Sequence, residues 1–457
     1  MLRTLSQHEL TTQITTQRRA ERLNLHPAPG VAFLTDTPTT ANEVLYDGRA
    51  TEVNSGRDCR LRVVARWLPS QDVRWTAHFP EPGPKAWSAA AKVRFRLKAR
   101  GAYSGQEVVG RARDSASGWM DGAEVVGRTE AAVPAVLVRW VNLGNVGQGN
   151  WLEAIAGDGT RQRWAGRGVW RVGEWTMAVD ARPDLRAVIE TLKNTGKYAV
   201  THLGTLHRID KRPFTAKECE PVLTAYQLVS SFVLGRFTCP ALAEARDDDG
   251  RLVWREWGAR LADPLGGVDA WWDWTAAPMG DPVRLLGERL LDPTRGRVAR
   301  HLAQSYVASN RGGFVEQRIT IAFAALELLS WQRAVLEGGA DPVKHENKNA
   351  DWRLRAMLKK AKIPISPIPA HLAALKAFAK KEGHGDAPKA VTDVRHRLTH
   401  PKALDDLYDR DRLLIEAWWL AVRYLELLIL HWIGYTGRIV DRTKRGWPQV
   451  DAVPWAP

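Results

Sequence analysis

Residues 391–402, VTDVRHRLTHPK, hold side chains whose types could do chemistry together. Arg395, His396 and His400 stand close in the chain, and Pro401 follows at once. A histidine can take a proton from a ribose 2′-hydroxyl, or deliver one to a leaving oxygen, near neutral pH. An arginine presents a rigid fork of donors to a phosphate whose charge grows in the transition state. An arginine with one or two histidines is therefore a set that could cleave RNA without a metal ion.

Pro401 controls how these side chains can meet. Proline disfavours helical backbone at the residue before it, so a helix through this segment should end at or just beyond His400. Five residues of helix turn through roughly 140°, so Arg395 and His400 would not share a face if the helix continued. A break at His400 lets its ring turn toward Arg395. His396, four positions earlier, lies on nearly the same face as His400 and could orient it or share a proton.

The elements around this segment are predicted to be helices of 3.6-residue periodicity. They cover residues 283–291, 314–336, 351–361, 370–381, 389–400 and 413–433. The last helix is long enough to span a bilayer, but it carries Glu416, Arg423 and Glu426, which are costly at membrane depth. We therefore expect a buried core helix in an all-α domain.

The front of the chain has a different pattern: short segments in which apolar and polar residues alternate, bounded by turn residues. Predicted strands are 59–67, 72–79, 92–100 and 135–143, followed by a helix at 184–196, a strand at 197–209 and a strand at 252–257. Thr215 and Glu218 have capping-box spacing and predict a second helix start. The predicted fold class is α+β. A β-rich N-terminal module, residues 1–280, could divide further near residue 180, and a helical bundle occupies residues 283–457.

Composition indicates an anionic partner. The 66 Lys and Arg exceed the 51 Asp and Glu, which gives a formal net charge of +15, so nucleic acid is the favoured partner and a membrane surface the competing one. Cys59, Cys219 and Cys239 lack the spacing of a zinc site or a disulfide framework. The N-terminus lacks a signal-like apolar run. We expect a cytoplasmic protein with no metal, no cofactor and no membrane partner.

Two basic segments are candidate binding surfaces. Residues 353–381 carry eight Lys or Arg and no acid, which could track an RNA backbone or form a solvated face. The candidate RNA contacts are Lys359, Lys360, Lys362, Arg397 and Lys402. In KVRFRLKAR, a strand would place five cations on one face: Lys92, Arg94, Arg96, Lys98 and Arg100. Because like charges repel, this face predicts an anionic partner or a facing acidic strand.

The order of Arg395 and His400 resembles the RxxxxH motif of HEPN ribonucleases, and the long helices on either side resemble that family too. Residues 300–440, including LELLILHWIGYTG, are similar to the HEPN domain of ApeA-type abortive-infection proteins, which defend bacteria against phage. Residues 175–260, with AVTHLGTLHRIDKRPFT, resemble the N-terminal domain of those proteins.

The resemblance implies a metal-independent endoribonuclease that leaves 2′,3′-cyclic phosphate ends. Arg395, His396 and His400 would be catalytic, and Glu327 on the preceding long helix is a candidate partner that fixes Arg395. It also implies a homodimer through the C-terminal domain, with a phage-derived trigger as a further partner. Two alternatives remain open. One is a non-catalytic HEPN protein that binds nucleic acid or dimerises, and the other is a toxin controlled by an antitoxin.

Overall fold

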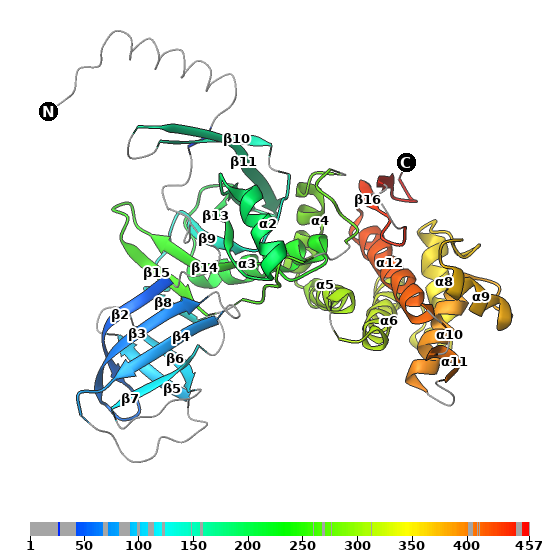
Figure 1. Ribbon diagram of the computed structural model, residues 1–457, viewed down its shortest axis with the longest axis horizontal. Coiled ribbons are helices and arrows are strands. Elements are labelled where there is room, and N and C mark those ends of the chain that lie inside the picture. Colours follow the sequence, from blue (N-terminus) through cyan, green and yellow to red (C-terminus); the bar gives the residue numbers. More distant parts are fainter. Residues whose placement is uncertain are drawn as a thin grey trace, which may run out of the picture. The chain divides into compact units, whose positions relative to one another are not determined.

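The computed structural model describes most of the chain, and its elements form two compact units. The described residues are 26–27, 43–66, 72–81, 92–97, 101–107, 114–120, 124–147, 149–155, 159–258, 260–266, 270–275, 277–311, 313–400, 405–408, 410, 412–444 and 450–456. The first unit comprises Met1–Trp170, Glu174–Glu218 and Pro240–Gly266, and the second comprises Arg171–Gly173, Cys219–Cys239 and Gly267–Pro457. The predicted α+β class is confirmed, with a β-rich front and a helical second half (Figure 1).

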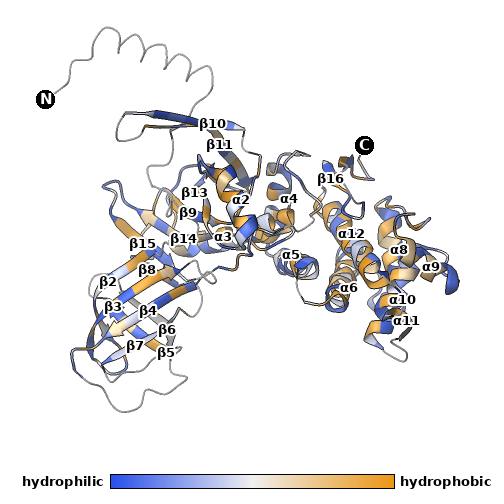
Figure 2. Cartoon of the chain, viewed as in Figure 1, coloured by the Kyte–Doolittle hydropathy of each residue, from blue (hydrophilic) through white to orange (hydrophobic). Residues whose placement is uncertain are grey.

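A closed barrel forms the first part of unit 1. Its strands are β2 (Glu43–Glu52), β3 (Asp58–Arg66), β4 (Asp72–His78), β5 (Lys92–Leu97), β6 (Gly101–Glu107) and β7 (Ser115–Trp119), in the order β2-β3-β4-β7-β6-β5. Hydrophobic and hydrophilic residues alternate along them (Figure 2). The inward set includes Leu61, Val63, Trp75 and Phe95, all at most 1% exposed. The period-2 pattern thus fills the barrel and leaves the polar set outside.

A nine-stranded sheet forms the rest of unit 1. In sheet order its strands are β1 (His26–Pro27), β10 (Asn150–Ile155), β11 (Arg161–Val172), β12 (Trp175–Ala181), β13 (Val200–Arg208), β9 (Val136–Val141), β14 (Cys239–Arg246), β15 (Leu252–Trp257) and β8 (Glu124–Gly127). Helix α2 (Leu185–Thr195) ends at Gly196, whose φ of 65° only glycine adopts without strain. A division of the chain near residue 180 would fall inside this sheet, at the end of β12.

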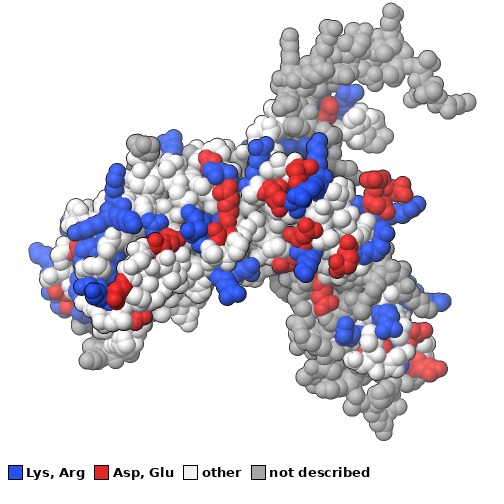
Figure 3. Space-filling view, turned by 180° about the vertical axis from the view of Figure 1, so that it is seen from behind, with Lys and Arg blue, Asp and Glu red and all other residues white. Residues whose placement is uncertain are grey.

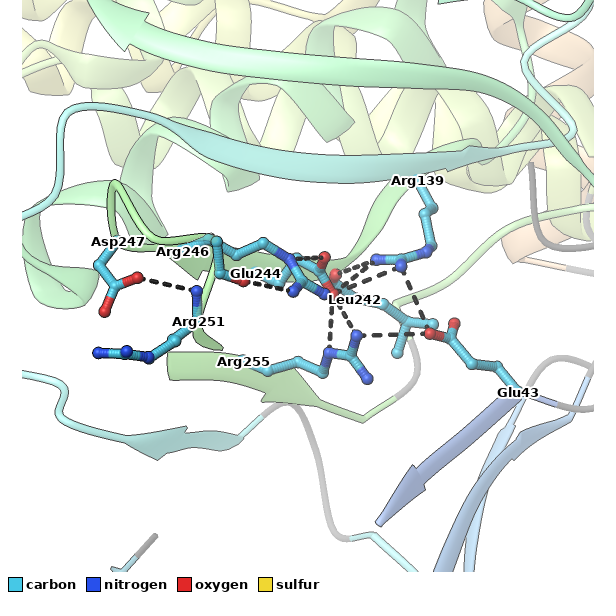
Figure 4. A network of polar contacts seen from close by, with 9 residues as sticks. Glu43, Arg139, Leu242, Glu244, Arg246, Asp247, Arg251 and Arg255 are labelled. Atoms are coloured by element: carbon cyan, nitrogen blue, oxygen red, sulfur yellow. Dashed lines mark hydrogen bonds and ion pairs between the residues drawn. The ribbon is translucent and has the colours of Figure 1, made fainter. Parts of the chain in front are cut away.

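A buried ion network links the barrel to the sheet within unit 1 (Figure 4). Arg139 of β9 places Nη2 3.3 Å from Glu43 Oε1 of the barrel and Nη1 3.4 Å from Glu244 Oε2 of β14. Arg255 of β15 donates from Nε to Glu244 Oε2 at 2.9 Å and places Nη2 3.5 Å from Glu43 Oε1. Burial raises the pKa of Glu43. Burial would also raise the pKa of Glu244, but the charges of Arg139 and Arg255 bring it below its usual value.

Unit 2 is built from helices. They are α3 (Ala216–Leu234), whose first three residues belong to unit 1, α4 (Gly280–Leu291), α5 (Gly296–Arg311), α6 (Val315–Trp331) continued by a π-helical turn (Gln332–Leu336), α7 (Pro342–Glu346), α8 (Ala350–Lys360), α9 (Ala373–Lys381), α10 (Ala387–Thr399), α11 (Asp405–Tyr408) and α12 (Leu413–Ile433); β16 (Arg438–Val440) pairs with β17 (Val450–Ala452). Thr215 and Glu218 form the predicted capping box at the start of α3. The compact units differ from the predicted boundary at residues 280–283, because residues 219–239 belong with the helices of unit 2.

Helix α12 is the core of unit 2. Almost all of its residues are buried, and it packs against α5, α6, α9 and α10. Figure 2 shows the concentration of hydrophobic residues along α6 and α12. Residues 315–336 are also apolar and long enough to cross a membrane by composition alone, and 44% of the most apolar part is buried inside the protein. Because α6 packs against α5 and α12, a core helix accounts for its composition.

The charged residues of α12 enter a buried polar cluster, as their position in a core helix requires. Glu426 is fully buried and accepts hydrogen bonds from Tyr306 Oη at 2.8 Å and Arg442 Nη1 at 2.9 Å. Arg423 places Nη1 3.8 Å from the other carboxylate oxygen. Burial and the charge of Glu426 hold the pKa of Tyr306 well above its usual value. We call Tyr306, Arg423, Glu426 and Arg442 the buried ion cluster.

Candidate active site

Helix α10 carries the predicted catalytic residues on its last turn. It begins with Asp386 as its N-cap, whose carboxylate accepts a hydrogen bond from Lys389 N at 2.9 Å, and Pro388 stands in its first turn. It ends at Thr399, and His400 leaves helical geometry with φ −130° and ψ 67°. The predicted break of the helix before Pro401 is therefore confirmed.

The break brings the two histidines together. The His400 amide still donates to the carbonyl of His396 at 2.9 Å, which keeps the two residues on one side of the helix end. Their ring centroids lie 4.9 Å apart with the planes tilted by 47°. Both histidines are exposed to solvent. A substrate can therefore reach either imidazole, and one ring can influence the orientation or proton of the other.

Arg395 is held from the neighbouring helix, as the sequence predicted. Its Nη2 lies 3.2 Å from Glu327 Oε1 of α6, with the two side chains 24% and 35% exposed. Its Nε is buried and lacks a hydrogen-bond acceptor among the described residues. Within the same part of the chain Arg395 does not hydrogen-bond to either imidazole. The guanidinium is thus oriented by one carboxylate, and since Nε is buried, the exposed part of the fork is what could receive an anion.

Arg397 has a different environment from the one expected of an RNA contact. Its Nη2 lies 2.6 Å from Glu382 and 3.1 Å from Asp393, and its guanidinium lies over the ring of Phe378, 5.0 Å from the centroid. Against partial burial, which would lower it, the hydrogen bond to Glu382 and the charge of Asp393 raise the pKa of Arg397. Two carboxylates already neutralise this cation, so a phosphate would have to compete with them.

The predicted lysines lie at the C-terminal end of α8. Lys359, Lys360 and Lys362 are all exposed, so their ammonium groups are available to an anionic partner. Figure 3 shows Lys and Arg side chains gathered at one end of unit 2. Lys402, the remaining candidate contact, lies outside the described residues.

The basic strand 92–100 alternates as predicted over its described part. Val93, Phe95 and Leu97 are at most 3% exposed, whereas Arg94 and Arg96 are exposed on the outer face of the barrel. Lys92 is the first residue of β5. Lys98 and Arg100 lie outside the described residues.

Two polar networks escaped the sequence prediction. Beside Arg397, His384 Nε2 lies 3.1 Å from Asp393 Oδ2. Arg410 lies over the ring of Phe378, the ring that Arg397 also contacts. The four-residue spacing of Asp393 and Arg397 could have revealed part of this network. The second is the network of Glu43 and Arg139, for which the one local sign is an arginine inside the apolar strand VLVRWV. Among the described residues, no group of three His, Cys, Asp or Glu is placed to hold a metal ion.

Two protein-family models match parts of this chain. Residues 128–268 match the family model described as the YopA central domain, and residues 292–451 match the YopA C-terminal domain. The central match covers most of the nine-stranded sheet, and the C-terminal match covers α5 to α12, with Arg395 and His400 inside it. The barrel of residues 43–119 lies before both matches.

A curated relative carries the same family name. The SPbeta prophage-derived uncharacterized protein YopA of Bacillus subtilis (strain 168) is 28% identical over 291 residues, which cover 62% of this chain and 64% of that protein. The alignment thus spans less than two thirds of the relative. No solved structure matches this chain. Neither family description states an activity, so the site itself must carry any proposal about function.

Proposed function

We propose that this protein is a metal-independent endoribonuclease of the HEPN class, with Arg395, His396 and His400 as its catalytic residues. The observation that supports this proposal most is the end of α10, where two exposed imidazoles lie 4.9 Å apart and a partly exposed arginine stands one position before the first of them. Catalysis by these side chains needs groups that are accessible and not neutralised by the protein itself. The two imidazoles meet both conditions, and Arg395, whose side chain is 24% exposed, can offer the part of its guanidinium that Glu327 does not occupy.

The reaction follows from these side chains. His400 removes the proton of the ribose 2′-hydroxyl as general base, and the oxygen attacks the adjacent phosphorus. The bond from phosphorus to the 5′-oxygen of the next nucleotide breaks, and a histidinium returns a proton to that oxygen. Arg395 stabilises the charge on the pentacovalent phosphate, and His396 assists the proton transfer. The products are a 2′,3′-cyclic phosphate and a 5′-hydroxyl that carries the returned proton.

Glu327 has a supporting role in this scheme. An arginine side chain has several rotatable bonds, and an ion pair at one side of its fork restricts them. Because Glu327 contacts Nη2 and Nε is buried, a phosphate would meet the exposed remainder of the guanidinium. Lys359, Lys360 and Lys362 would attract the RNA backbone electrostatically.

The proposed setting is antiphage defence in the cytoplasm. The name of the relative records a prophage origin, which fits a role in conflict between phages and their hosts. A homodimer through unit 2 would bring two copies of Arg395 and His400 into one cleft, as a two-fold interface pairs equal surfaces. The first unit would restrain the nuclease or sense a phage-derived trigger.

Purified full-length protein should cleave RNA in EDTA and leave cyclic phosphate and 5′-hydroxyl ends on the products. Arg395→Lys should be inactive, because a point charge does not replace a planar fork. His301→Ala is the matched control, since His301 is an exposed histidine of α5 away from the motif. Products with 5′-phosphate ends, or activity that EDTA abolishes and a divalent ion restores, would contradict the mechanism.

A second candidate is a HEPN protein that binds nucleic acid or dimerises without cleaving. The pairing of Arg395 with Glu327 favours it, because a phosphate must share that guanidinium with a carboxylate. RNA that remains intact after prolonged incubation with purified protein at micromolar concentration, while still bound, would support this second function.

A further inference from the structure

The outer face of the barrel carries five exposed arginines: Arg49 of β2, Arg60 and Arg62 of β3, and Arg94 and Arg96 of β5. We call them the barrel arginine face. Two of them belong to the basic strand described above. The other three come from strands that sequence patterning alone does not bring to β5.

Strand register makes these arginines neighbours. Arg49 pairs directly with Arg60 across β2 and β3, and Asp47 pairs with Arg62. On the other side of β2, Thr51 pairs with Arg96, and the Val53 amide donates to the carbonyl of Arg94. Paired residues of an antiparallel ladder point to the same face, with neighbouring strands about 4.8 Å apart. The five guanidinium groups therefore share one continuous surface over β3, β2 and β5.

The protein itself compensates little of this charge. Arg60 has an ion pair with Asp47 at 3.0 Å, but its side chain is 75% exposed. Asp58, opposite Thr51, accepts a hydrogen bond from the Thr51 hydroxyl at 2.7 Å and keeps its negative charge, so Asp47 and Asp58 offset part of the charge of the five arginines. Within the described residues Arg49, Arg62, Arg94 and Arg96 have no ion pair. By contrast, Arg167 and Arg260 of the sheet part of unit 1 are each paired with a carboxylate at 2.6 Å.

Uncompensated like charges on one face are unfavourable in the free protein. Arginines directly opposite each other in a ladder repel, and a domain without a use for them would lose stability from their presence. An anionic partner removes this repulsion and releases its own counterions. A partner with several negative charges would therefore bind this face favourably.

We propose that the barrel arginine face binds the phosphodiester backbone of a nucleic acid. Successive outward residues of a strand are about 6.6 Å apart, which is comparable to the spacing of phosphates along an extended strand. Arginine forks match phosphate oxygens in pairs. The residues opposite these arginines include Thr51, Thr76 and His78, and no large apolar side chain among them offers the buried anchor that protein interfaces use. The proposal stands independently of whether α10 cleaves RNA.

The test measures binding of a fluorescein-labelled 20-nucleotide RNA to the full-length chain by anisotropy, in a His400→Ala background that prevents cleavage. The variant is the triple substitution Arg62→Glu, Arg94→Glu, Arg96→Glu. Its matched control reverses three exposed arginines of the sheet part of unit 1, Arg161→Glu, Arg186→Glu, Arg251→Glu. Both variants change the net charge equally, so a difference between them reports position and not total charge.

The barrel variant should bind at least tenfold more weakly than the control at low salt. The slope of log affinity against log salt concentration should fall by about 2, since each phosphate contact contributes roughly 0.7 for single strands. A triple Arg→Gln version, with a melting curve like that of the parent, should give the same direction and excludes unfolding as the cause. Equal binding by barrel and control variants overturns the proposal. So does preferential displacement of the RNA by polyglutamate at equal charge, which would assign the face to an acidic protein.

Discussion

The helical unit uses arginine and glutamate in two opposite ways. In the buried ion cluster, Glu426 is fully buried and receives Tyr306 and Arg442 at hydrogen-bond distance. At the end of α10, Arg395 and Glu327 also form a pair, but their side chains are 24% and 35% exposed. Similar residue types thus occur in two settings, and the difference lies in whether solvent and a ligand can reach them.

This comparison separates stability from reactivity. A buried charge must be compensated completely, because water does not help and each uncompensated ion costs several kcal/mol. An exposed pair contributes little to stability, about 0–1 kcal/mol, so its geometry can be set by a ligand. Substitutions in the buried ion cluster should therefore change folding, and substitutions at the end of α10 should change chemistry alone.

The largest expected effect is on catalysis by His400→Ala. Loss of a well-placed proton-transfer group reduces a rate by about 100- to 10,000-fold. The exposed position of His400 predicts that the free energy of unfolding changes by less than about 0.5 kcal/mol. RNA cleavage rates and urea unfolding of the same preparation check both statements. A variant that loses activity because it unfolds would erase the distinction between the two sites.

Glu426→Ala should have the largest effect on stability. It leaves Arg442 in the core without a carboxylate, while Arg423 keeps Asp441 at 3.8 Å, and breaking such a buried pair costs about 3–5 kcal/mol. Glu346→Ala, on the exposed face of α7, is the control and should be nearly neutral. Thermal unfolding followed by circular dichroism measures the difference. Equal melting temperatures for the two variants would contradict the role assigned to the buried ion cluster.

The same contrast extends to a histidine of unit 1. His202 is fully buried in β13, and this burial lowers its pKa to about 3, whereas an unfolded histidine titrates at 6.5. Its folded pKa is the lower one, so its contribution to stability is complete above pH 6.5 and is lost as the pH falls toward 3. At pH 5 the loss amounts to about 2 kcal/mol. His202→Gln should flatten this part of the stability profile, while His400→Ala should leave it unchanged.

The smallest effect should come from Glu327→Gln, which keeps the shape of the side chain and removes its charge. Because an exposed ion pair contributes about 0–1 kcal/mol, stability should change by less than that amount. Loss of orientation at Arg395 should reduce cleavage by less than tenfold. A rate increase would instead show that the carboxylate competes with the phosphate. Steady-state cleavage of one defined RNA measures either outcome.

Local sequence was sufficient for the features that depend on neighbouring residues. Pro401 predicted the helix break at His400, and the alternation of β5 predicted its outward arginines. Helix α5 was missed, although Leu302, Tyr306 and Val307 recur at helical spacing, because alanine and serine between them weaken the contrast of the pattern. The nuclease assignment itself still depends on the RxxxxH resemblance and the arrangement at α10.

Partners distant in the chain could not be predicted in this way. Arg139 contacts carboxylates 96 and 105 residues away, and nothing in either segment specifies the other. The barrel closes in the order β2-β3-β4-β7-β6-β5, which requires pairings between strands far apart in sequence. The arginine face exists only after those pairings form. Sequence periodicity gave the faces of single strands, and strand pairing decided which faces became one surface.

The network of Glu43, Arg139, Glu244 and Arg255 constrains how this sequence can change over generations. Each arginine contacts both carboxylates, so replacing any one of the four residues leaves a buried charge with too few partners. A lineage could pass from one stable version to another only through at least two coordinated substitutions. The four positions, one from the barrel and three from the sheet, should therefore be inherited and exchanged together.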